Sequence, residues 1–275
     1  MRTPAATVLI RAKDEAPSIG RTLAIIASQT IADRLQVLVV DSGSTDGTVQ
    51  IATDAGAEVL ELAPEEFTYG RALNYGCEHA RGDIVISLSA HAFPRSRDWA
   101  ERMLEPFRDP RVACAGGMHR DADGAPLRAR VVQDYESARH APTWGYSNHA
   151  GAFPRSLWER RPFRADLPYT EDKEWAWAWL KEGHVVVLDP ELDVDHSHAE
   201  SWMDTYRRSR SEWTGFAMFL DMPDHGPQGL LAEWWSHTAD YDSRIRELIS
   251  PRRMLRLLGA YRGKRIGAAR SAPSS

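Results

Sequence analysis

Two adjacent carboxylates, Glu171 and Asp172, open an aromatic-rich segment of this chain. A carboxylate in such a place can take a proton from a hydroxyl group while that hydroxyl attacks, and so serve as the base of a transfer reaction. Acidic residues are also common in the first turn of a helix, where they complement the helix dipole. The sequence leaves these two readings open.

A second polar group, residues 41–47, reads Asp-Ser-Gly-Ser-Thr-Asp-Gly and follows a strongly apolar run. Small residues permit close approach of a ligand, and an acid after a buried strand can accept hydrogen bonds from a nucleobase or a ribose hydroxyl. The alternative is a turn in which Asp or Ser caps the next helix. Both interpretations fit the residue types.

Strands and helices alternate along the first half of the chain, which predicts an α/β fold with a mostly parallel central sheet. The expected strands are 7–11, 35–40, 57–62, 83–88, 112–117 and 184–188, and the expected helices are 17–27, 47–55, 71–79, 97–107 and 171–181. Ligands bind at the carboxyl ends of such strands. Residues 11–15, 41–46 and 89–91 are therefore expected on one rim. The centre of the chain, rich in Arg, is expected to be mostly loop.

Composition narrows the class of protein. At 275 residues with 43% hydrophobic and 27% charged residues, the chain is typical of a globular protein. A net charge of −5 argues against a general nucleic-acid binder. The ten tryptophans either pack in the core or stack on sugars and nucleobases.

The chain is expected to be cytoplasmic, with peripheral contact to a membrane as the alternative. Cys77 and Cys114 have no metal-binding spacing, which favours a reducing compartment. No run of about 18 apolar residues predicts a membrane span, and the N-terminus lacks the apolar region of a signal peptide. Residues 200–246 look helical, and the stretch from Pro251 onward carries seven cations and no acid. Residues 251–270 can bind an anionic membrane surface or form an ordinary solvated tail.

Six segments taken in order resemble the motifs of family 2 glycosyltransferases with the GT-A fold, and of rhamnosyltransferase-like members in particular. They are Arg11-Ala12-Lys13-Asp14-Glu15, Asp41 to Gly47, Gly70-Arg71-Ala72-Leu73-Asn74-Tyr75-Gly76, Ser89-Ala90-His91-Ala92-Phe93-Pro94, Glu171-Asp172-Lys173-Glu174-Trp175-Ala176 and His196-Ser197-His198. The resemblance covers about residues 5–200. It implies a GT-A-like domain over 1–210, followed by a helical C-terminal extension with a basic tail over 211–275.

The resemblance also implies an inverting enzyme that moves a sugar from a nucleotide-diphosphate donor to an acceptor hydroxyl. Asp172, with Glu171 beside it, is similar to the catalytic base of the family. The implied donor-binding residues are Arg11, Lys13, Glu15, Asp41, Ser42, Arg71, Ser89 and Ala90. The implied acceptor-side residues are Asn148, Gly151 and Trp175.

The chain departs from the family where most members place a triplet that ends in Asp and binds a divalent metal. Here the triplet is Ser89-Ala90-His91, so an imidazole replaces a carboxylate. Imidazole suits Mn²⁺ better than Mg²⁺, and His196 resembles the distal histidine that completes such a site in some members. A loop histidine can also be an ordinary hydrogen-bonding surface residue, but on the resemblance we expect a divalent metal, Mn²⁺ or Mg²⁺, held by His91 and His196. His198 is the weaker candidate because strand alternation points it away from His196.

Two other functions compete with glycosyl transfer. A non-catalytic nucleotide-sugar-binding protein is compatible with the missing Asp at position 91. A nucleotidyltransferase would carry a glycine-rich phosphate loop after the first strand, and Arg11 to Glu15 contains no glycine.

Overall fold

The computed structural model describes residues 3–196, 201–222 and 251–271. Two compact units divide the chain: the first comprises Met1–Ala165 and Asp172–Ser197, and the second comprises Asp166–Glu171 and His198–Ser275. The expected domain boundary at residue 210 falls inside helix α8 (Trp202–Ala217). A boundary near residue 197 leaves that helix whole.

An eight-stranded sheet forms the centre of the first unit, with strand order β3-β2-β1-β4-β8-β6-β9-β7. The strands are β1 (Ala6–Ala12), β2 (Leu35–Asp41), β3 (Glu58–Glu61), β4 (Ile84–Ser89), β6 (Val112–Gly117), β7 (Val131–Gln133), β8 (Ala150–Pro154) and β9 (Val185–Asp189). Strand β8 runs antiparallel to β4 and β6, β7 runs antiparallel to β9, and the other neighbours are parallel. A separate antiparallel pair joins β5 (Ala92–Pro94) to β10 (Val194–His196).

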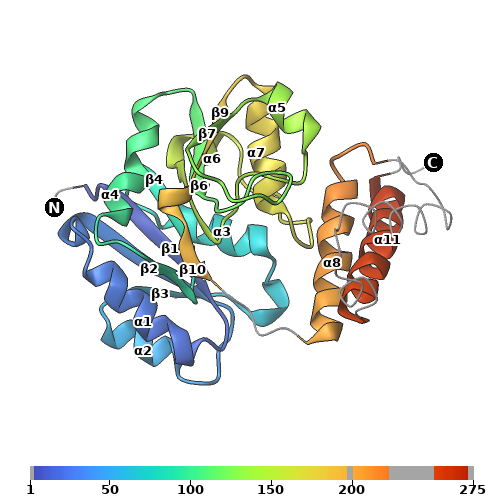
Figure 1. Ribbon diagram of the computed structural model, residues 1–275. Coiled ribbons are helices and arrows are strands. Elements are labelled where there is room, and N and C mark those ends of the chain that lie inside the picture. Colours follow the sequence, from blue (N-terminus) through green and yellow to red (C-terminus); the bar gives the residue numbers. More distant parts are fainter. Residues whose placement is uncertain (1–2, 197–200, 223–250, 272–275) are drawn as a thin grey trace. The chain divides into compact units, whose positions relative to one another are not determined.

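Helices cover both faces of this sheet (Figure 1). One face packs on α1 (Ala16–Ala27), α2 (Thr48–Asp54) and α4 (Trp99–Leu104), and the other packs on α3 (Tyr69–Glu78), α6 (Arg155–Arg160) and α7 (Glu171–Lys181). Neighbouring residues of β1 divide accordingly, with Val8 and Ile10 on the first face and Leu9 on the second. Strands buried on both faces need near-continuous apolar runs, which is why the sequence predicted them.

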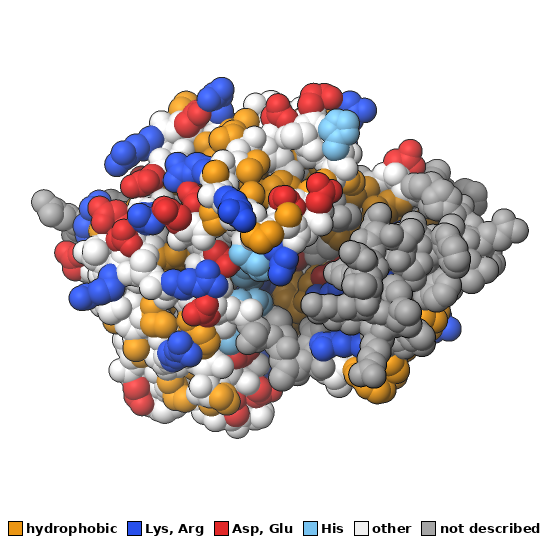
Figure 2. Space-filling model, in the orientation of Figure 1, with side chains coloured by type: hydrophobic (Ala, Val, Ile, Leu, Met, Phe, Trp, Pro, Cys, Tyr) orange, Lys and Arg blue, Asp and Glu red, His pale blue; other side chains and the backbone are white. Residues whose placement is uncertain are grey.

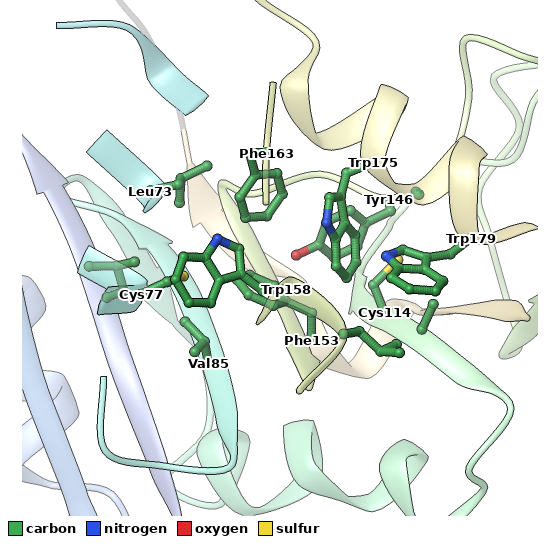
Figure 3. Packing of buried hydrophobic residues seen from close by; sticks show 14 of the residues in the cluster. Leu73, Cys77, Val85, Cys114, Tyr146, Phe153, Trp158, Phe163, Trp175 and Trp179 are labelled. Carbon is green, nitrogen blue, oxygen red and sulfur yellow. The ribbon is translucent and has the colours of Figure 1, made fainter. Parts of the chain in front are cut away.

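Aromatic side chains fill the second layer (Figure 3). Trp175 is fully buried, its ring lies 5.3 Å from both Phe153 and Phe163, and its indole N–H donates to the Arg161 carbonyl at 2.6 Å. Trp179 continues the cluster at 5.8 Å from Trp175. The structure therefore places Trp175 in the core and not on a surface where an acceptor can stack.

The centre of the chain holds more regular structure than expected. It contains β7, helix α5 (Tyr135–His140), β8 and α6, where the sequence predicted mostly loop. Helix α4 is shorter than the predicted 97–107 because a 3₁₀ turn, Glu105–Arg108, begins one residue before Pro106. Proline lacks the N–H that would continue an α-helix.

The second unit contains α8 and α11 (Pro251–Ser271), which lie side by side. Of the predicted helical region 200–246, residue 200 and residues 223–246 lie outside the described part. Among the described residues, no helix is both long and apolar enough to cross a membrane.

The burial of Trp175 predicts that Trp175→Ala lowers the free energy of unfolding by about 3–5 kcal/mol, because it leaves a cavity in the aromatic layer. Urea unfolding followed by circular dichroism measures the loss. The matched control is Trp177→Ala on the same helix, where the side chain is only partly buried, and it should cost clearly less. Equal and small losses for both variants would show that Trp175 does not support the core.

Candidate active site

The loops that follow β1, β2 and β4 meet at one edge of the sheet, as the sequence predicted. In the strand register Ala12 lies opposite Asp41, and Arg11 lies opposite Ser89. Three of the predicted donor-binding segments therefore share one rim. Parallel strands produce this because their carboxyl ends point the same way.

Two of these loops, 12–16 and 41–48, bind each other through reciprocal hydrogen bonds. The backbone N–H of Asp14 donates to Ser44 Oγ at 2.8 Å, and the N–H of Thr45 donates back to Asp14 Oδ1 at 2.8 Å. Glu15 N–H donates to Thr48 Oγ1 at 2.8 Å. These hydrogen bonds fix the backbone of Glu15, whose carboxylate lies against His91 in the loop after β4.

Asp41 is 2% exposed, and its carboxylate organises its own loop. Its Oδ1 accepts from the N–H groups of Gly43 and Ser44 at 2.9 and 2.8 Å, and its Oδ2 accepts from Ser44 Oγ at 2.5 Å. Gly43 takes φ = 85°, a conformation that favours glycine, and a Cβ there would lie 2.5 Å from Pro64. Asp41 thus shapes the rim as a turn, although α2 begins after Gly47 without the side-chain cap that the turn interpretation included.

Each of the three cations predicted to bind donor has a partner within the protein. Arg71 pairs with Glu66 at 2.6 Å in an exposed ion pair. The Arg11 guanidinium lies 5.2 Å from the centre of the Tyr69 ring, and Lys13 donates to the Gly43 carbonyl.

Three imidazoles form a row beside the rim. The His91 and His196 rings stack with centroids 4.8 Å apart and planes 12° apart, and His149 follows at 5.0 Å from His196. His91 Nδ1 lies 2.7 Å from Glu15 Oε1, so the loop 12–16 holds the His91 ring in place. Figure 2 shows histidine side chains gathered near the middle of the face in view.

This arrangement tests the expected metal site. A carboxylate on Nδ1 of a histidine is the usual outer partner of a metal ligand, and Glu15 supplies it to His91. However, ring nitrogens direct their lone pairs within the ring plane, so two stacked rings do not aim at one point. Among the described residues no group of three His, Cys, Asp or Glu side chains could hold a metal ion. As arranged, His91 and His196 do not fit a shared metal, and His198 lies outside the described residues.

The carboxylate of Asp172 is oriented by two backbone N–H groups. Lys173 N–H donates to its Oδ1 at 2.7 Å, and Asn148 N–H donates to its Oδ2 at 3.0 Å. Asn148 is itself fixed, because its Oδ1 accepts from the buried Tyr146 hydroxyl at 2.7 Å and its carbonyl accepts from Ser87 Oγ at 2.8 Å. The structure thus holds Asp172 in one orientation.

The remaining predicted residues have structural positions. Glu171 is 4% exposed and belongs to the second unit, whereas Asp172 belongs to the first. Gly151 lies in β8, where a Cβ would come within 2.5 Å of the Tyr146 ring. Ala90 is buried, and its carbonyl accepts from Thr22 Oγ1 at 2.7 Å.

His149 is a site residue that sequence reasoning did not single out. It follows Asn148 directly, and its carbonyl accepts from the N–H of Ser89 at 2.9 Å, which ties it to the rim. Its Nδ1 lies 3.0 Å from Ser147 Oγ. Burial lowers the pKa of His149, and the Asp172 charge opposes that shift. The segment Ser147 to Gly151 contains this histidine, but only the pairing of β8 with β4 shows that it lies beside the rim.

Sequence comparison relates this chain to known proteins. A family model described as Glycosyl transferase family 2 matches residues 7–165. The O-antigen chain rhamnosyltransferase WbaN of Salmonella anatum is 27% identical over 178 residues, covering 59% of this chain and 56% of the relative. The O-antigen chain rhamnosyltransferase RfbN of Salmonella typhimurium is 27% identical over 200 residues, covering 66% and 63%. The matched regions therefore span about three fifths of these relatives.

Solved structures share the fold. The mannosyltransferase PcManGT from Pyrobaculum calidifontis, in complex with GDP-Man and Mn²⁺, has a TM-score of 0.68 at 22% identity, over 98% of this chain and 87% of that one. The glucosyl-3-phosphoglycerate synthase of Mycobacterium tuberculosis, with Mn²⁺, UDP-glucose and phosphoglyceric acid, has a TM-score of 0.62 at 18% identity, over 81% and 82%. The likeness confirms the expected GT-A-like fold.

The lowered pKa of His149 predicts a pH-dependent stability. Below about pH 6.5, the ordinary histidine value, the unfolded chain takes up a proton that the folded chain resists, so the free energy of unfolding falls as the pH falls. Thermal melts between pH 5 and pH 8 should show that His149→Gln is less sensitive to acid than the parent. His140→Gln, at an exposed position, is the control. An unchanged acid sensitivity in His149→Gln would contradict the prediction.

Proposed function

This chain belongs to glycosyl transferase family 2, and we propose that it is an inverting glycosyltransferase that moves a sugar from a nucleotide-diphosphate donor to an acceptor hydroxyl. The observation that carries the proposal is the orientation of Asp172 by the N–H groups of Asn148 and Lys173. Each carboxylate oxygen accepts one of these bonds and has lone-pair capacity for a further donor. An acceptor hydroxyl is such a donor.

On this proposal Asp172 takes the acceptor proton while the hydroxyl oxygen attacks the anomeric carbon of the sugar. Attack comes from the face opposite the diphosphate, a new C–O bond forms, and the bond to the diphosphate breaks with its electron pair on the leaving oxygen. The product therefore has inverted configuration. Glu171, buried and in the other compact unit, has the lesser role of a neighbouring carboxyl group.

We place the donor at the rim formed by residues 11–15, 41–46 and 89–91. The support is their shared edge of the sheet and the hydrogen bonds that fix two of the loops to each other. The row His91, His196, His149 runs from this rim to the residue next to Asn148. Donor and base are thereby two ends of one site. The proposed contacts are Arg11, Lys13, Glu15, Ser42, Arg71, Ser89 and Ala90, with Asp41 holding the shape of the loop that carries Ser42.

The acceptor side is proposed at Asn148, beside Asp172. Gly151 acts there only by letting Tyr146 pack closely, and Trp175 is left out because it is buried in the core. WbaN and RfbN are named as rhamnosyltransferases and PcManGT as a mannosyltransferase, so we propose a hexose or deoxyhexose as the transferred sugar. A thermal-shift panel of nucleotide sugars identifies the donor, because stabilisation grows with ligand concentration relative to Kd.

A divalent metal at His91 and His196 stays a prediction, and no step of the transfer is assigned to it. Two similar solved structures contain Mn²⁺. Here the two rings would have to turn out of their stack to share an ion. We keep the cytoplasm as the proposed location, since Cys77 and Cys114 are free and buried.

The assignment of the base predicts that Asp172→Asn lowers turnover by about 10² or more, while donor binding survives. The amide keeps the shape of the carboxylate but cannot accept the proton. Steady-state kinetics with the best donor, together with calorimetry of donor binding, measures both effects. Glu171→Gln is the matched control and should retain turnover within a few-fold. Loss of turnover in the control alone would assign the base to Glu171, and donor binding without any turnover in the parent would support a non-catalytic binding protein.

The metal prediction is tested by binding of the nucleoside diphosphate, with no turnover needed. If both imidazoles hold one ion, Mn²⁺ should strengthen binding more than Mg²⁺, and His91→Ala and His196→Ala should each remove this gain without adding up. His91→Asp should shift the preference toward Mg²⁺, because oxygen replaces nitrogen as the ligand. Equal binding by the parent in Mn²⁺ and in EDTA would show that the stacked rings bind no shared metal.

A further inference from the structure

Helices α8 and α11 pack in parallel, with their backbones in close contact. Gly259, Gly263 and Gly267 recur every four residues on α11. A Cβ at these positions would lie 2.6, 2.4 and 2.3 Å from the carbonyl oxygens of Tyr206, Arg210 and Thr214, respectively. The constant offset between these partners shows that the two helices run in the same direction.

Hydrogen bonds along the pair agree with this direction. Arg252 Nε donates to Thr205 Oγ1 at 3.0 Å near one end, and Ser209 Oγ donates to the Arg256 carbonyl at 2.8 Å one turn further on. At the far end Ser271 Oγ donates to the Ala217 carbonyl at 3.1 Å. The N-terminal ends of both helices therefore lie together.

That shared end exposes large apolar side chains. Trp202 is 57% exposed, Met203 is 49% exposed and Met254 is 50% exposed. The first two open α8, the third lies in the first turn of α11, and the parallel packing brings all three to one end. Exposed apolar side chains gathered in one place mark interaction surfaces more often than scattered ones do.

The same end carries a concentration of positive charge. Arg252, Arg253 and Arg256 lie in the first two turns of α11, a helix with no acidic residue at all. Positive charge at a helix N-terminus opposes the helix dipole, so the charge of these arginines does not stabilise the helix.

We propose that this shared end, made of Trp202, Met203, Met254, Arg252, Arg253 and Arg256, docks on an anionic lipid surface. Trp and Met bury their apolar parts at the level of the lipid acyl chains, while the guanidinium groups reach the phosphates. A nucleic acid would use the arginines but offers Met203 and Met254 no apolar layer. The surface refines the expected membrane contact of residues 251–270, and it does not depend on the proposed transfer reaction.

The test is cosedimentation of the full-length protein with vesicles of phosphatidylcholine, alone or mixed with phosphatidylglycerol. The parent should bind the mixed vesicles and release them as salt increases. The double variants Trp202→Ser with Met254→Ser, and Arg253→Gln with Arg256→Gln, should each lower the partition coefficient by about tenfold or more. Circular dichroism of each variant checks that the helices remain.

The matched control is Arg265→Gln with Arg270→Gln, which removes the same charge from the far end of α11. It should lower binding by less than about threefold. Lipids with brominated acyl chains should quench part of the tryptophan fluorescence of the parent, and Trp202→Phe should remove that part. Equal losses for the two arginine pairs, quenching that persists in Trp202→Phe, or no binding by the parent would each overturn the proposal. So would binding to double-stranded DNA as strong as that to the vesicles.

Discussion

The mutual hydrogen bonding of loops 12–16 and 41–48 is the constraint on which the site depends. Each bond contributes only about 0.5–1.5 kcal/mol net, but they are reciprocal, so neither loop can move without the other. Asp14, in the first of these loops, has a positive φ of 53°. With Glu15 fixed in this way, His91 has a defined partner, and the stacked rings of His196 and His149 follow from it. The hydrogen bonds between the two loops thus help to set the position of the donor rim relative to the base.

Asp41 and Trp175 show where residue type and position diverge. The sequence indicated that both were able to bind ligand. In the structure the Asp41 carboxylate accepts three hydrogen bonds from its own loop, and Trp175 packs among Phe153, Phe163 and Trp179. The sequence does not tell whether an acid after a strand, or a tryptophan in a helix, faces a ligand or the rest of the protein. Only the position of the neighbouring elements decides between them.

Most of the sheet was predictable because β1, β2, β4 and β6 are apolar runs between turns, and parallel strands buried on both faces require such runs. Strand β8 was not, because Ala150-Gly151-Ala152 lacks β-branched residues and its strand propensity is low. Its small residues have a reason: Tyr146 packs against Gly151 where a side chain would collide. Missing β8 meant missing His149, since the pairing of Ala150 with Leu88 is what brings that imidazole to the rim.

The two compact units reflect different solutions to packing. In the first, large aromatic side chains fill the space between sheet and helices, and the functional groups stand on loops held by hydrogen bonds. In the second, glycines let the backbones of α8 and α11 approach closely, so few large side chains are buried between the two helices. Such packing leaves Trp202, Met203 and Met254 on the outside instead of between the helices. Parallel helices also align their dipoles, which is unfavourable, and the arginines at the N-terminal end of α11 add to that cost. An arrangement that gives up stability in two ways at one end, and exposes apolar side chains at the same end, is better explained by a surface that binds there than by the needs of the fold.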